Sequence, residues 1–178
     1  NHFYWRMNTR RMEAQVVRDS LLHLAGVLDT KMGGPSINSS DAVRRRSLYF
    51  KHSRDQQDKL LKIFNDADHL QCYRRTESIV PQQALALANS KLAIEMSGLI
   101  AKRWRKGEGE RGGGGDGEFV GRVFLLLLGR LPDAAERDDC LKTLNELEAI
   151  AMAARKGNPM QRARRGLVHA LLNHNDFV

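Results

Sequence analysis

Apolar residues recur every three or four positions along most of this chain, and that spacing restricts its fold more than any other feature. Ala14, Val17, Leu21 and Leu28 follow the spacing near the start, and later segments repeat it. Residues spaced in this way share one face of an α-helix, and that face is buried against other helices. The sequence therefore predicts a mainly α fold: a small helical bundle with long loops and at most one short strand or hairpin.

Capping residues and helix breakers place the expected boundaries. Asp55 is the expected cap of the second helix, because a side-chain oxygen there accepts hydrogen bonds from the first turn. Pro81 suits the start of the third helix, and Asn89–Ser90 is a candidate break within it. Ser47–His52 is rich in strand formers and is the expected extended segment. Helices are expected at residues 8–29, 55–64, 81–104, 119–128, 134–155 and 160–172.

A glycine-rich run divides the chain at residues 106–118. Glycine has unusual backbone freedom, so such a run opposes any fixed conformation, and we expect a flexible linker or insertion there. It would join an N-terminal helical part, 1–105, to a C-terminal helical hairpin with a final helix, 119–178. The two parts are expected to pack as one domain. The run does not match a phosphate-binding loop, because no Lys followed by Ser or Thr comes after its glycines.

The chain has a formal net charge of +8, and its arginines and lysines occur in short clusters. Such clusters most often coat the solvent faces of helices, which is the interpretation we favour. They would also suit a nucleic-acid backbone, and binding of that kind weakens steeply as salt is added. Nucleic-acid binding is therefore kept as an alternative function.

Neither a membrane span nor a leader peptide is expected in these residues. The longest apolar run, Phe124–Leu128, stops at Gly129 and is far shorter than a bilayer requires. The chain starts at Asn1 without a basic-then-apolar leader, so we expect it to be a fragment of a longer protein.

The chain lacks the common catalytic and metal-binding motifs. His69 and Cys72 have the spacing of half a zinc site, but no second pair completes it. Arg74 and Arg75 would favour the thiolate of Cys72, although a buried structural cysteine is the commoner outcome. We expect no metal, no cofactor and no catalytic residue within this chain. Whether it forms part of an enzyme stays open.

Several segments read together resemble a C-terminal domain of unknown function from large planctomycete proteins. The most specific is a central motif of Cys72, Arg74-Arg75-Thr76 and Pro81–Leu85. The other similar segments are Arg10–Leu22, Met32–Ser36, Arg45–Tyr49, Leu128–Pro132, Ala170–Asn173 and Asp176–Phe177. The similarity therefore covers most of the chain.

In that family the domain follows cytochrome-c-like and other planctomycete-specific domains of long exported proteins. The resemblance implies a periplasmic or cell-surface location, with the upstream domains of the same protein as partners. It implies no activity, and no haem function is carried over to any residue of this chain.

A polar cluster around the central motif is the predicted ligand site. Guanidinium groups hold carboxylate or sulfate through paired hydrogen bonds, so an acidic polysaccharide or another anion is the expected ligand. In the alternative interpretation, these arginines only cap helix ends and tie the loop expected at residues 65–80 to the helical bundle. The leading function is a structural or interaction module, and the other alternative is an enzyme completed by upstream residues. The predicted site residues are Arg45, Arg46, Cys72, Arg74, Arg75, Thr76 and Gln82.

Overall fold

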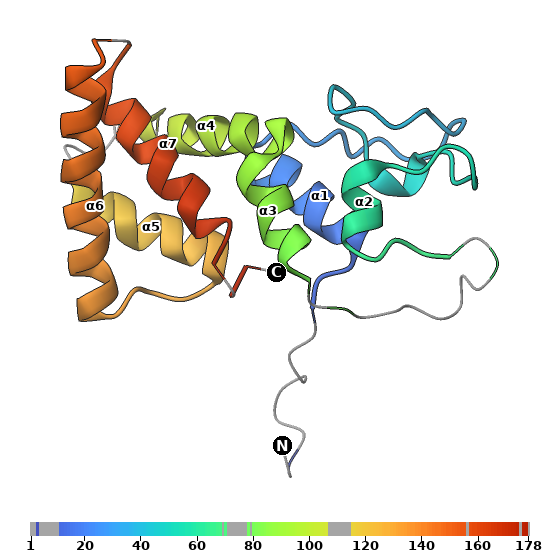
Figure 1. Ribbon diagram of the computed structural model, residues 1–178, viewed down its shortest axis with the longest axis horizontal. Helices are drawn as coiled ribbons and strands as arrows, with labels where there is room; N and C mark the ends of the chain where they lie inside the picture. Colours follow the sequence, from blue (N-terminus) through green and yellow to red (C-terminus); the bar gives the residue numbers. More distant parts are fainter. Residues whose placement is uncertain are drawn as a thin grey trace.

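The computed structural model shows a helical protein, as predicted (Figure 1). It describes residues 3, 11–68, 70, 78, 80–106, 115–155, 157–174 and 176–177, with the backbone alone at 104–106. Within these residues there are seven α-helices, one 3-10 helix and no regular strand. The elements are α1 (Ala14–Leu24), η1 (Ser47–Tyr49), α2 (Lys59–Ile63), α3 (Pro81–Asn89), α4 (Lys91–Lys106), α5 (Asp116–Leu128), α6 (Ala134–Ala153) and α7 (Pro159–Leu171).

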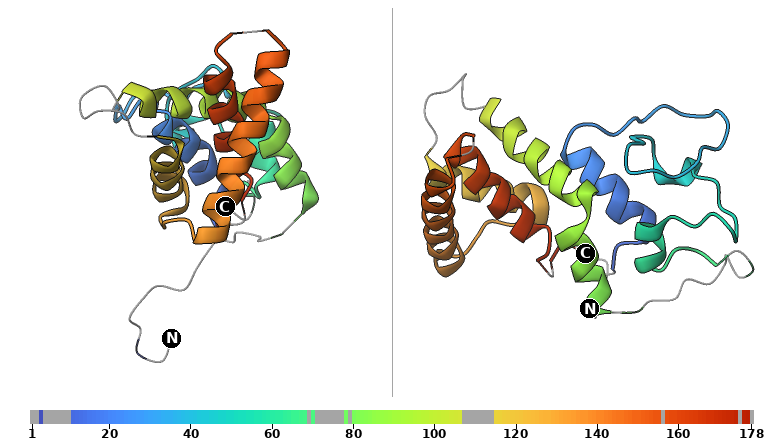
Figure 2. Two further views of the ribbon diagram at one scale, coloured as in Figure 1. Left: turned by 90° about the vertical axis from the view of Figure 1, so that its left-hand side faces the viewer. Right: turned by 45° about the horizontal axis from the view of Figure 1, so that its top comes forward.

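Helix α4 lies at the centre of the molecule. It contacts α1 and α3 on one side and α7 on the other, while α6 packs on α7 and α5. The right-hand view of Figure 2 shows α4 running between α7 and α1. Side chains from both sides of the glycine-rich run join in one hydrophobic core. The division of the chain into domains is not tested by this arrangement and stays a prediction.

Helix α1 ends earlier than its apolar pattern predicts. Gly26 has a φ of +74°, a left-handed value that glycine adopts without strain. The N–H of Gly26 donates to the carbonyl of His23 at 2.9 Å, and that of Val27 to Leu22 at 3.0 Å. These bonds satisfy the last carbonyls of the helix and turn the chain away. The predicted continuation to Asp29 was therefore wrong.

The segment after α1 is a long loop held by isolated backbone pairs. The predicted extended stretch Ser47–His52 instead begins with η1, and its β pairing is limited to a single bridge between Phe50 and Ile37. A strand needs a continuous partner, which this loop does not supply. The predicted cap Asp55 was also wrong, because Asp58 caps α2 by accepting a hydrogen bond from the N–H of Leu61.

The chain bends sharply between α3 and α4. Helix α3 ends at Asn89 and Ser90 takes an extended conformation, so the predicted break at Asn89–Ser90 is confirmed. Among the described helices, none is long and apolar enough to span a membrane alone. Helix α3 and residues 91–103 of α4 meet that criterion only as a pair bent by 58°.

Helices occupy both ends of the predicted linker. Helix α4 reaches Lys106 and α5 begins at Asp116, so helices cover the two ends of the predicted run 106–118. Residues 107–114 lie outside the described part, and the linker itself stays a prediction. Asp116 and Glu118 lie in the first turn of α5, where carboxylates interact favourably with the helix dipole. Asp116 also pairs with Arg164 of α7 at 3.1 Å.

Arg130 ties the end of the chain to the turn between α5 and α6. Its Nη1 and Nη2 atoms each donate to one carboxylate oxygen of Glu136 at 2.7 Å, and its Nε donates to Asp176 at 3.0 Å. Asp133 caps α6 and exchanges hydrogen bonds with Glu136. The neighbouring Phe177 is buried in the core. We call Arg130, Glu136 and Asp176 the C-terminal latch.

The latch should make stability depend on pH in the acid range. Hydrogen bonds from Arg130 and then from the Asp133 N–H lower the pKa of Glu136 from 4.5 to about 2. The carboxylate therefore stabilises the fold above about pH 4.5, and this contribution is lost as the pH falls toward 2. Urea unfolding of Glu136→Gln should show a smaller loss of stability over this range than the unsubstituted chain. Glu146→Gln, an exposed change on the same helix, is the control, and equal pH profiles for both variants would contradict the assignment.

Candidate functional site

Arg18 holds the long loop against α1. It is only 2% exposed. Its Nη1 donates to the carbonyl of Arg45 at 3.1 Å and to Ser47 Oγ at 3.2 Å, and its Nη2 donates to the carbonyl of Val43 at 2.5 Å. The guanidinium lies 4.5 Å from the centre of the Phe50 ring. Burial lowers the pKa of Arg18, and nearby Asp19 opposes that shift.

Asp19 completes this network. Its carboxylate accepts hydrogen bonds from the N–H of Ser47 at 2.9 Å and from Ser47 Oγ at 2.6 Å, and it lies 3.5 Å from Arg18. The buried cation and its acceptors are therefore mutually satisfied, as burial of a charge requires. We call Arg18, Asp19 and Ser47 the loop clamp.

Arg45, a predicted ligand residue, is engaged within the loop. Its guanidinium lies 3.9 Å from the centre of the Tyr49 ring and donates to the carbonyl of Gly33. The Tyr49 hydroxyl in turn accepts a hydrogen bond from the Gly33 N–H at 2.8 Å. Arg45 thus holds the glycine loop in place, and its predicted role in ligand binding stays a prediction.

The other predicted ligand residues are dispersed or lie outside the described part. Arg46 is partly exposed, 4.0 Å from Asp19, and Gln82 is exposed in the first turn of α3. Its neighbour Gln83 is the buried glutamine, donating to the carbonyls of Ile63 and Ser78. No hydrogen bond or ion pair between described residues joins Arg45, Arg46 and Gln82. Cys72, Arg74, Arg75 and Thr76, like His69, lie outside the described residues, so the cluster stays a prediction.

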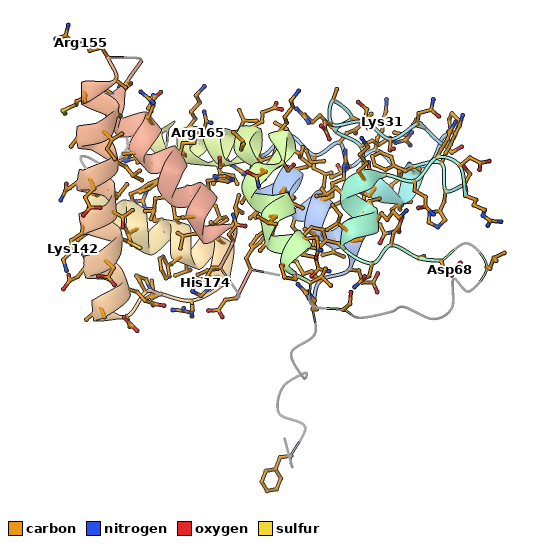
Figure 3. All side chains as sticks on the ribbon, in the orientation of Figure 1. Lys31, Asp68, Lys142, Arg155, Arg165 and His174 are labelled. Carbon is orange, nitrogen blue, oxygen red and sulfur yellow. The ribbon has the colours of Figure 1, made fainter. Side chains whose placement is uncertain are left out.

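A cleft of about 670 Å³ opens between α4 and the first half of α7. Its volume falls within the range of small-molecule sites. Figure 3 labels Arg165 at the place where α7 meets α4. Glu95 is the acidic residue among the described lining. The cationic lining residues are Lys91, Lys102, Arg162, Arg164 and Arg165.

The charges around this cleft are only partly neutralised. Glu95 pairs with Arg44 of the long loop at 2.6 Å. Arg164 is buried, pairs with Asp116, and lies 4.6 Å from the centre of the Phe119 ring, so it belongs to the fold. Within the described part of the chain, Lys91, Lys102 and Arg165 make no ion pair. Those three side chains give the cleft a net positive charge.

The sequence showed the separate basic clusters but did not predict that those of α4 and α7 line one cleft. Lys91, Glu95 and Lys102 have the spacing of one helix face, whereas Arg165 lies more than 60 positions away from Lys102. Nothing local in the sequence indicates that α7 packs beside α4. Co-variation between the two segments is the kind of signal that reveals such a contact.

The described residues contain no other obvious reactive centre. No group of three or more His, Cys, Asp or Glu side chains among them is arranged to hold a metal ion. Cys140 is buried, and burial, followed by the charges of Glu136 and Asp139, raises the pKa of its thiol. A thiol of that kind stays protonated at neutral pH and is a poor nucleophile.

Comparison with known families gives one match. The model of the family PSD1, described as "Protein of unknown function (DUF1553)", matches residues 1–144. The chain belongs to the PSD1 family. No curated protein and no solved structure matches it. The PSD1 match includes the loop clamp and α4 but ends within α6, so the α7 side of the cleft lies outside the matched residues.

In this PSD1 chain, the loop clamp should be essential for stability. Arg18→Met leaves the Asp19 carboxylate without its buried cation and the carbonyls of Val43 and Arg45 without their donor, which should cost about 3 to 5 kcal/mol. Arg18→Lys should not restore the loss, because an ammonium cannot reproduce the planar fork. Urea unfolding followed by circular dichroism measures both variants. Arg54→Met, a change on the exposed loop, is the control; a similar stability for Arg18→Met and this control would refute the clamp.

Proposed function

We propose that this chain is a binding module that holds an anionic ligand in the α4–α7 cleft. The observation that carries the proposal is the imbalance of charge. Lys91, Lys102 and Arg165 line the cleft without ion-pair partners among the described residues, while the acidic Glu95 is engaged by Arg44.

The position of Arg165 suits it to hold the anionic group. A guanidinium can form two parallel hydrogen bonds to a carboxylate or sulfate, and such charge-assisted bonds are stronger than neutral ones. The effective dielectric constant between two helices is lower than in bulk water, which strengthens the attraction further. A lysine at each side of Arg165 along α4 would add attraction without requiring a fixed geometry.

The biological setting of the module rests on the resemblance described above. We propose that the chain is the C-terminal part of a larger exported protein associated with cytochrome-c-like domains, located in the periplasm or at the cell surface. Its upstream domains would then be its first partners. An acidic polysaccharide is an anion that such a location can present, and it provides the first probe.

Trigalacturonate, a short acidic sugar, tests the anion-binding proposal. We expect calorimetric titration to detect binding that weakens as salt is added, because the attraction is between charges. Arg165→Ala should weaken binding about tenfold, the loss expected for a charge-assisted hydrogen bond. Lys62→Ala, a change at an exposed position of α2, should leave the binding unchanged.

Two outcomes would refute this function. One is equal binding by Arg165→Ala and Lys62→Ala. The other is that duplex DNA displaces trigalacturonate equally well from Arg165→Ala and from Lys62→Ala. That result would indicate a general attraction of polyanions to the basic surface.

A further inference from the structure

Between its cationic side chains, the α4–α7 cleft has an aliphatic wall. Ile94, Leu99 and Ala101 contribute from α4, and Met160 contributes from the first turn of α7. Met160 is 43% exposed, and Ile94 and Leu99 are only partly buried. Covering such apolar surface releases it from water and is favourable. The cleft can therefore bind a ligand through apolar contacts as well as through charge.

The cations lie along this wall at both ends and in the middle. Lys91 and Lys102 are eleven positions apart on α4, about 16 Å along the helix axis. Arg165 reaches the same helix between them, since a Cβ atom built on Gly98 would lie 3.5 Å from its Cδ. This separation is that of an ordinary van der Waals contact, so the aliphatic stem of Arg165 lies against α4 at this position. Its charged head remains exposed at the edge of the wall.

The cleft has few of the side chains that usually bind sugars. None of the described residues lining it is aromatic, and Asn158 and Gln161 are its neutral hydrogen-bonding side chains. The Asn158 side chain already accepts a hydrogen bond from the Gln161 N–H at 3.1 Å as the cap of α7. Hydroxyl groups that lie against the aliphatic wall would lose their water without gaining a hydrogen-bond partner there, which is costly. A hydrocarbon chain has no such requirement.

We infer that the natural ligand of this cleft is an aliphatic chain ending in an anionic head group, such as a medium-chain carboxylate. The head group binds Arg165, with Lys91 or Lys102 as the second cation according to the direction of the chain. The hydrocarbon tail lies on Ile94, Leu99 and Met160. This inference rests on the proposed anion-binding function and adds the class of ligand.

A series of carboxylates of increasing length tests the inference. Acetate, hexanoate, octanoate and decanoate would be titrated calorimetrically into the whole chain, below the concentrations at which they form micelles. Affinity should rise up to about fourfold for each added methylene that the wall covers. Octanoate should bind more tightly than trigalacturonate, and Arg165→Ala should weaken the binding of both.

Variants at two exposed methionines separate the wall from the charge. Met160→Gln removes apolar surface from the cleft and should weaken octanoate binding about fivefold, while trigalacturonate binding stays the same. Met152→Gln, on α6 and 57% exposed, lies outside the cleft and should change neither. Circular dichroism of both variants verifies that they fold.

Each other result has a definite meaning. If affinity does not rise with chain length while trigalacturonate binding still depends on Arg165, the ligand class is wrong and the proposed function stands. If neither the carboxylates nor trigalacturonate bind, both the ligand class and the proposed function are wrong. If octanoate binds equally to Met160→Gln and Met152→Gln, the tail lies elsewhere and the inference is overturned.

Discussion

Burial of α4 on two sides is the constraint on which the rest of the structure depends. Leu92, Met96 and Ile100 are at most 1% exposed, and each such side chain contributes about 1.5 to 3 kcal/mol when fully removed from water. Helices α1 and α3 cover one part of this surface and α7 covers another. The part of the α4 surface that these helices leave uncovered forms one wall of the cleft. The candidate site is thus a consequence of how the core is built.

The arginines of this chain serve different purposes that composition alone does not distinguish. Arg18 is buried and bonds to backbone carbonyls of the loop, Arg130 joins the chain end to α6, and Arg164 of α7 pairs with Asp116 of α5. Each is committed to the fold. Arg165 follows Arg164 directly, yet it is exposed and makes no ion pair with any described residue. Neighbouring residues on a helix point about 100° apart. The guanidinium of Arg164 is therefore directed into the fold, while that of Arg165 is available to a ligand.

The extent of sequence prediction follows from the range of each interaction. The mainly helical fold and the break at Ser90 were predictable, because periodicity and backbone competition act over a few residues. Helix ends were less so: Gly26 ends α1 inside a continuous apolar pattern, and Asp58 rather than Asp55 caps α2. Of the predicted ligand residues, Arg45 is engaged by Tyr49 and Gly33, and Gln82 is exposed beside the buried Gln83. The first outcome depends on the course of the long loop and the second on the packing of α3 against α2, and no local pattern in the sequence gives either.

By itself, the sequence determined which segments are helical, which face of each helix is apolar, and that positive charge is in excess. Those properties are local, since they depend on spacing and residue type within a few turns. Only the tertiary structure decided which of the charged side chains are neutralised in ion pairs. Arg44 reaches Glu95, Asp116 reaches Arg164, and α7 settles beside α4, all across separations of more than 45 positions. The charged side chains that remain without such a partner form the candidate binding surface. Pairing between residues so far apart in the sequence is fixed by the packing of the whole chain.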